Sequence, residues 1–170
     1  INRPDKLNAL NLNVLSVLGQ RLVEVAQDSD VRAVVLTGAG RKAFVAGADI
    51  AELLPMDYHA AMAFSEAGNR TLSQIERLNV PVIAAVNGFC VGGGVGLVGN
   101  ADCIVASDDA YFGVPEVNQG ALGAATHMAR LVPPHMLRTL YFTARTIKAV
   151  DLVQFGSVLE TVPREELMDA

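Results

Sequence analysis

The stretch that decides the fold is PVIAAVNGFCVGGG, which runs from Pro81 to Gly94. Its first part, residues 81–86, is apolar and rich in β-branched side chains, a pattern typical of a buried strand. Asn87-Gly88 marks a turn, and the glycine cluster at residues 92–94 leads into a helix of small residues that reaches Asn100. The sequence here predicts a unit of strand, glycine turn and helix.

The same unit occurs once earlier in the chain. Val31–Thr37 is a β-branched apolar run, best interpreted as a buried strand, and a loop over residues 39–48 leads to the turn Ala46-Gly47-Ala48-Asp49. A helix is predicted from about Asp49 until Pro55 stops it. A helix start exposes unpaired N–H groups and the positive end of its dipole, and glycine lets a ligand approach the backbone. If the two glycine turns meet in space, they polarise one carbonyl oxygen and stabilise its enolate.

The rest of the chain predicts further helices and strands in alternation, which favours an α/β layered fold. The expected helices are residues 12–27, capped by Asn11, residues 59–78, and a largely helical stretch from Ala124 that is interrupted at Pro133-Pro134 and Gly156 and ends in a helix at 165–170. Two more strands are expected, at residues 101–106 and 111–113.

Composition indicates a single soluble domain over residues 1–170, with 51% hydrophobic residues, 18% charged residues and a net charge of −5. No apolar run is long enough to predict a membrane span and the start does not resemble a secretion signal, so a cytoplasmic location is expected, with an organelle matrix as the alternative. An acidic chain without a basic, aromatic-lined stripe gives no support for nucleic-acid binding. Cys90 and Cys103 lie in apolar surroundings, which favours buried thiols over a disulfide or zinc site, and no metal-binding spacing is present.

Glu116 is the candidate proton carrier. It follows Phe112-Gly113-Val114-Pro115 in an otherwise apolar stretch, where poor hydration raises the pKa of a carboxyl group toward values useful in acid–base catalysis. A surface or capping glutamate is the alternative. The glycine cluster at 92–94 fits neither nucleotide-binding fingerprint, and close packing of a helix on a sheet is its alternative explanation.

Other polar residues carry weaker signals. His127 is expected to be structural, with an approach to the ligand pocket as the alternative, and Asp102 is expected to be a turn or helix-terminus partner. Four cations flank the first glycine turn, where they either meet ligand phosphates or form a solvated face: Arg3, Lys6, Arg41 and Lys42.

Four ordered motifs resemble the crotonase superfamily, and within it the enoyl-CoA hydratase/isomerase family. They are Asn2-Arg3-Pro4 with Asn8-Ala9-Leu10, then Ala43–Ile50, then Pro81–Gly94, then Phe112–Glu116. The resemblance spans nearly the whole chain and implies a ClpP/crotonase superhelix of ββα units. The first strand and the C-terminal helical part of that fold are expected to be missing, so the chain is interpreted as a fragment of a longer protein.

The resemblance also implies roles for individual residues. Ala48 and Gly93 match the positions whose N–H groups hold the thioester oxygen of an acyl-CoA, and Glu116 matches a catalytic acid–base residue. The implied substrate-binding residues are Ala46, Ala48, Asp49, Ile50, Ala51 and Gly93. Coenzyme A is then part of the substrate, no separate cofactor is expected, and relatives imply a homotrimer or a dimer of trimers.

Gly96 departs from the hydratase pattern, because it stands where hydratases carry a second glutamate. With Glu116 alone, the expected reactions are hydration of a 2-enoyl-CoA or isomerisation of a 3-enoyl-CoA to a 2-enoyl-CoA. The alternatives are another enolate reaction, such as decarboxylation, thioester hydrolysis or dehalogenation, and an acyl-CoA binder without turnover.

Overall fold

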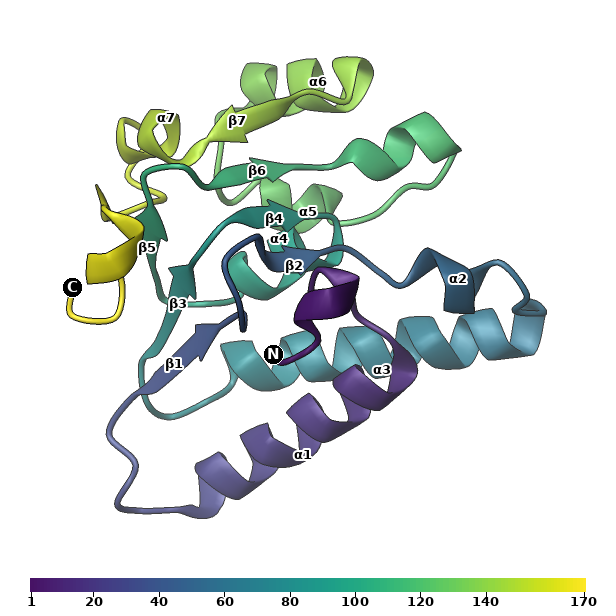
Figure 1. Ribbon diagram of the computed structural model, residues 1–170. Helices are drawn as coiled ribbons and strands as arrows, with labels where there is room; N and C mark the ends of the chain where they lie inside the picture. The colour runs from purple at the N-terminus through teal and green to yellow at the C-terminus, as the bar shows by residue number, and fades with distance from the viewer.

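The computed structural model describes residues 1–170 as an α/β fold with two four-stranded sheets (Figure 1). The first sheet has the order β1-β3-β5-β8 and is parallel throughout. The second has the order β2-β4-β6-β7 and is parallel except for the antiparallel pair β6–β7. The strands are β1 (Val34–Thr37), β2 (Ala43–Ala46), β3 (Val82–Val86), β4 (Phe89–Val91), β5 (Cys103–Ser107), β6 (Tyr111–Gly113), β7 (Thr146–Lys148) and β8 (Glu160–Val162).

The first six strands alternate between the two sheets. In each of the pairs β1–β2, β3–β4 and β5–β6, the first strand belongs to one sheet and the second strand to the other, and helical segments follow each pair. This repetition is the ββα superhelix predicted from the sequence, and it confirms the predicted fold class. The α-helices are α1 (Leu12–Gln27), α2 (Ile50–Leu53), α3 (Tyr58–Glu76), α4 (Gly93–Val98), α5 (Ala125–Met128), α6 (Pro134–Thr143) and α7 (Ala149–Val153). The 3₁₀ helices are η1 (Pro4–Lys6), η2 (Pro115–Gln119) and η3 (Arg164–Glu166).

Helices α1 and α3 lie side by side on one side of the molecule, with α6 and α7 on the opposite side (Figure 1). The start of α1 is set by Asn11, whose side chain accepts a hydrogen bond from the N–H of Val14 at 2.9 Å, as the sequence predicted. One face of α1 buries Leu15 and Leu22. The hydroxyl of Thr71 in α3 donates to the carbonyl of Leu15, which joins the two helices by a buried polar contact.

The structure corrects several predicted boundaries. The first strand begins at Val34 rather than Val31, and the expected loop at residues 39–48 contains β2. Strands β4, β7 and β8 were not predicted, and the expected helix at 165–170 is wrong, because only η3 and turns occur there. The missed strands have three or four residues each, and their hydrogen bonds come from distant segments that local sequence does not specify.

The core joins the two sheets to the helices, with Phe44 of β2 and Phe112 of β6 fully buried. None of the helices has both the length and the apolar character needed to cross a bilayer. Both cysteines are free thiols; Cys90 is buried, which raises its pKa, whereas Cys103 is partly exposed rather than buried as expected.

Candidate active site

The two glycine turns of the sequence meet in space. One follows β2, the other follows β4 and opens α4, and the two strands are hydrogen-bonded neighbours in the second sheet. A Cβ atom placed on Gly93 would lie 3.7 Å from the carbonyl carbon of Gly47, the atom bonded to the nitrogen of Ala48. It would also lie 2.8 Å from Cδ1 of Leu10, which forms a β-bridge with Ala48. The first turn, the start of α4 and Leu10 therefore converge on one small region.

The N–H groups of Ala48 and Gly93 are both free to bind a ligand. Neither donates a hydrogen bond within the chain, whereas nearby Asp49 donates to Leu10 at 2.8 Å and Gly96 donates to Gly92 at 3.2 Å. Gly93 is the first residue of α4, where an N–H has no partner within its own helix. Both residues are partly exposed, whereas the rest of α4 is buried. Two free donors next to each other are the arrangement that stabilises an oxyanion.

Glu116 lies beside these donors. It belongs to η2, and its Oε2 is 3.2 Å from the position that a Cβ on Gly92 would occupy. Burial is the main cause that raises the pKa of this carboxyl, and a hydrogen bond to its own backbone opposes the shift. No cation pairs with it and no side chain donates to it. A carboxyl that is poorly hydrated and unpaired is suited to carry a proton.

The residues expected to contact coenzyme A have mixed surroundings. Asp49 is buried and its carboxylate pairs with the Arg3 guanidinium at 3.0 Å, so these two charges bind each other. This ion pair holds the N-terminal segment against the first glycine turn, and Arg3 also donates to the carbonyl of Ala9 within that segment. Ile50 and Ala51 of α2 are exposed, and Ala46 at the end of β2 is half-buried. The other three flanking cations, Lys6, Arg41 and Lys42, are exposed.

The resemblance expects a second glutamate where this chain has Gly96. The space beside Gly96 is filled by an aliphatic side chain. A Cβ on Gly96 would lie 3.3 Å from Cδ1 of Leu72, a residue of α3. Gly96 is buried in α4, one helical turn beyond Gly93. A carboxylate side chain at position 96 would therefore require Leu72 to move, and this part of the site is apolar.

Tyr141 of α6 lies near Glu116, and sequence analysis did not identify it. Its hydroxyl donates a hydrogen bond to the carbonyl of Gly123, and a Cβ on Gly123 would lie 3.3 Å from Oε1 of Glu116. Burial, and then the negative charge of Glu116, raise the pKa of Tyr141 to about 12. The sequence signal was weak, since a single tyrosine between Leu140 and Phe142 is typical of a helix that packs on a core.

His127 and Asp102 have structural surroundings. His127 lies in α5 against Gly99, where burial lowers its pKa and the nearby Arg130 charge lowers it further. Asp102 accepts a hydrogen bond from the N–H of Val82 at 2.8 Å, so it fixes the chain at the start of β3. These contacts agree with the structural interpretation of both residues.

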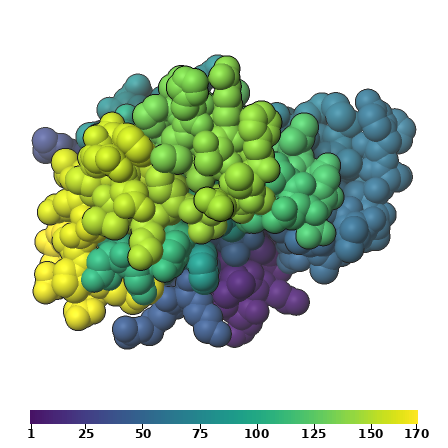
Figure 2. Space-filling model, turned by 90° about the horizontal axis from the view of Figure 1, so that it is seen from above, coloured from purple at the N-terminus to yellow at the C-terminus, as the bar shows by residue number.

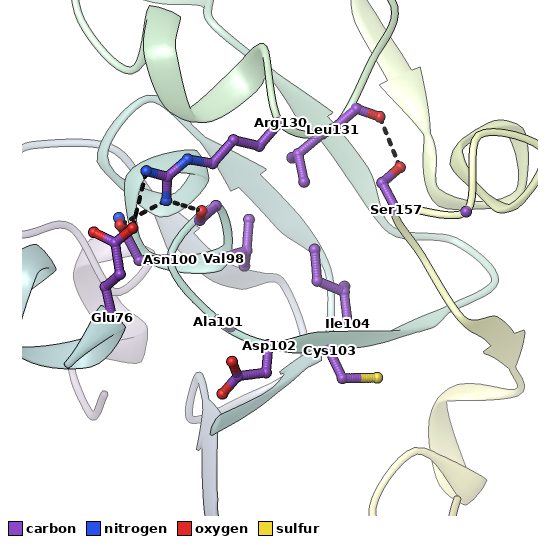
Figure 3. A pocket seen from close by; sticks show the side chains of 12 residues that line it. Glu76, Val98, Asn100, Ala101, Asp102, Cys103, Ile104, Arg130, Leu131 and Ser157 are labelled. Atoms are coloured by element: carbon purple, nitrogen blue, oxygen red, sulfur yellow. Dashed lines mark hydrogen bonds and ion pairs between the residues drawn. The ribbon is translucent and has the colours of Figure 1, made fainter. Parts of the chain in front are cut away.

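A cavity of about 370 Å³ lies at the other end of α4, and Figure 3 shows its lining. Arg130 donates to the carbonyl of Gly99 at 2.8 Å and to the Asn100 side chain at 2.9 Å, and it pairs with Glu76. A cation at a helix C-terminus binds the last carbonyls and interacts favourably with the dipole. Arg130 therefore binds the C-terminal end of α4, the helix whose other end carries Gly93.

Comparison with known proteins identifies the family. The enoyl-CoA hydratase/isomerase family profile matches residues 1–170, and the chain belongs to this family. A hydrolase of Rhodococcus jostii, (7aS)-7a-methyl-1,5-dioxo-2,3,5,6,7,7a-hexahydro-1H-indene-carboxyl-CoA hydrolase, is 53% identical over 89% of this chain and 59% of its own length. A short-chain-enoyl-CoA hydratase of Clostridium acetobutylicum is 44% identical over 99% of this chain and 66% of its own length.

The fold is also that of a solved family member. The crystal structure of enoyl-CoA hydratase from Bacillus anthracis superposes with a TM-score of 0.93 at 33% identity, covering 98% of this chain and 66% of that protein. The chain thus spans about 59 to 66% of the length of these relatives. Over this length it has the crotonase fold of the enoyl-CoA hydratase/isomerase family.

Proposed function

We propose that this chain is the core of an acyl-CoA hydrolase that cleaves a carbon–carbon bond next to a ketone. In this proposal the N–H groups of Ala48 and Gly93 bind the thioester oxygen, and Glu116 carries one proton. The observation that carries the proposal is the single unpaired carboxyl beside two free N–H donors, with Leu72 against Gly96 in place of a second acid. Any reaction at this site must then work with one proton carrier.

Hydrolysis of a carbon–carbon bond next to a ketone needs only one proton carrier. Water adds to a ketone carbon that lies β to the thioester, and Glu116 accepts the proton that the water loses. The bond between this carbon and the α carbon then breaks, and its electron pair forms a thioester enolate whose oxygen accepts from Ala48 and Gly93. Glu116 returns its proton to the α carbon. One water is consumed, a carboxylic acid and a CoA thioester are formed, and Glu116 ends as it began.

The comparison with the Rhodococcus jostii hydrolase supports this choice of reaction. That relative's name describes a dioxo-substituted indene carried on CoA, and it shares more identity with this chain than the Clostridium acetobutylicum hydratase does. A fused-ring substrate also suits an apolar surface such as that made by Leu72 beside Gly96. We therefore propose a cyclic, ketone-bearing acyl-CoA as the substrate class.

The second candidate function is isomerisation or hydration of the double bond of an enoyl-CoA. A single carboxyl also suffices to move a proton from the γ to the α carbon of a 3-enoyl-CoA, or from water to the α carbon of a 2-enoyl-CoA. The family match and the hydratase relative favour this candidate. It differs from hydrolysis in its products, because the carbon skeleton stays intact.

The test offers three substrates to the full-length protein and to its Glu116→Gln variant: a cyclic β-keto acyl-CoA, a 2-enoyl-CoA and a 3-enoyl-CoA. Mass spectrometry identifies the product, and a thiol reagent detects free CoA. We expect the cyclic ketone to gain one water with CoA still attached, and Glu116→Gln to lose about 10² to 10⁴ in kcat. Release of free CoA, faster turnover of an enoyl-CoA, or binding of all three without turnover each contradicts the proposed reaction. Unchanged kcat in the variant removes Glu116 from the mechanism.

A further inference from the structure

The loop at residues 120–124 lies against the Glu116 carboxyl. It joins η2 to α5, and its residues 120–122 are exposed. Gly123 packs so closely on Glu116 that an added Cβ would lie 3.3 Å from Oε1. Two of its residues have left-handed backbone, Gly120 at φ +71° and Ala124 at φ +50°, and for alanine this conformation is unfavourable. The loop therefore needs contacts to hold it in this shape.

One hydrogen bond ties this loop to an element beyond its neighbours η2 and α5. It is the bond from the Tyr141 hydroxyl to the carbonyl of Gly123. The other bonds are local: Gly120 and Ala121 donate to η2, and Ala124 accepts from Met128 in α5. Tyr141 reaches the loop because α6 packs against η2. Its hydroxyl is thus the link between α6 and the segment that covers Glu116.

We propose that Tyr141 is a positioning residue for Glu116, and that its hydroxyl holds the loop at 120–124 against the carboxyl and so limits its contact with water. The inference rests on the proposed role of Glu116 as proton carrier, whichever acyl-CoA reaction that role serves. The phenol stays protonated at neutral pH, because its pKa is raised to about 12, so the hydroxyl remains a donor throughout the working range.

The effect on Glu116 follows from hydration. Burial is the leading cause of its raised pKa, and a loop released from Tyr141 would let water reach the carboxylate. The pKa would then fall toward the ordinary glutamate range, and a carboxylate with a lower pKa accepts a proton less readily in the transition state. Loss of the hydroxyl should therefore slow turnover and also move its pH dependence.

Other ionisable groups near Glu116 do not explain its raised pKa. Helix α4 and the loop at 120–124 carry none, and α5 carries only His127, which lies against Gly99. In α6, His135 and Arg138 are exposed, and neither contributes to the pKa shift of Glu116. In α6, Tyr141 is the side chain whose pKa the negative charge of Glu116 raises.

The test is Tyr141→Phe in the full-length protein, which removes one oxygen atom and keeps the ring. Tyr111→Phe is the matched control, because the Tyr111 hydroxyl makes no hydrogen bond within the chain and its ring stacks on Phe89. Steady-state kinetics across pH use whichever acyl-CoA the wild type converts. We expect Tyr141→Phe to lose about tenfold in kcat with KM within about twofold, and the acid limb of its kcat profile to move to lower pH. Tyr111→Phe should match the wild type in kcat, in KM and in the position of the acid limb.

A measurement without substrate separates this inference from the proposed function. Infrared titration follows the Glu116 carboxyl band, which is assigned by its loss in Glu116→Gln. A lower titration midpoint in Tyr141→Phe than in the wild type supports the positioning role, even if the reaction proves to differ. An unshifted midpoint, or a loss of kcat with an unmoved acid limb, overturns it.

Discussion

Replacement of Gly94 by alanine tests whether the separation of β2 and α4 sets the activity. Gly94 is buried in the first turn of α4, and an added Cβ would lie 2.5 Å from the carbonyl oxygen of Val45 in β2. Ordinary contact begins at 3.4 Å, so the helix must move from the strand by about 0.9 Å. That motion separates the N–H of Gly93 from that of Ala48, and a misplacement of about 1 Å can cost roughly 10² in rate.

The assay is kcat/KM for the preferred acyl-CoA, together with circular dichroism and thermal unfolding to show that the variant is folded. Gly68→Ala in α3 is the control, because its Cβ would lie 3.9 Å from the nearest atom outside its own helix. We expect Gly94→Ala to lose about 10² in kcat/KM and Gly68→Ala to stay within about twofold of wild type. A folded Gly94→Ala variant with nearly wild-type activity would refute the assignment of the two turns as one oxyanion site.

Three further predictions concern stability. Glu116→Gln should raise the thermal midpoint at neutral pH, because burial disfavours the carboxylate in the folded state; the gain should vanish as pH falls through the ordinary glutamate pKa, and a gain that persists at acid pH contradicts the cause. Asn11→Ala removes the cap of α1 and should cost about 1 kcal/mol in urea unfolding, so an unchanged midpoint would show the cap to be dispensable. Arg130→Ala removes the donor that binds the end of α4 and should lower the free energy of unfolding by about 1 to 2 kcal/mol. Glu76→Gln breaks only a half-exposed ion pair and should cost less. Equal losses in the two variants would show that the ion pair, and not the contact with α4, carries the effect.

Several elements were predictable because their signals are local. The cap at Asn11 and the apolar spacing that follows predicted α1 with its observed bounds, and the apolar run at 82–86 predicted β3. The second glycine turn and the start of α4 also lie where the sequence placed them. In each case the residues that form the element also carry the signal.

Strands β2, β4, β7 and β8 were not predictable in the same way. β2 and β4 have four and three residues, and each is stabilised by pairing with its partner across more than forty intervening positions. Gly40 and Gly47 also make residues 39–48 resemble a loop, so the local sequence does not indicate β2. At the end of the chain, the segment 160–162 is a strand because β5 offers it hydrogen bonds, and the predicted helix beyond it does not form.

Some residues of the candidate site were likewise predictable from the sequence, and others were not. The sequence identified Ala48, Gly93 and Glu116 as separate motifs, and the resemblance assigned their roles. It did not identify Tyr141, because the contact of its hydroxyl with Gly123 joins α6 to a loop 18 positions earlier. It also did not show that Leu72 of α3 fills the space beside Gly96.

By itself, then, the sequence determined the family, the longer helices and several of the strands, and the chemical character of each turn, because glycine, proline, caps and apolar runs act over a few neighbouring bonds. The tertiary structure alone decided that two free N–H groups and one half-buried carboxyl share a region. Parallel pairing of β2 with β4 puts the end of β2 next to the start of α4, and the packing of α6 on η2 brings a phenol to the loop beside Glu116. Such contacts depend on packing between segments far apart in the chain, which no local pattern encodes.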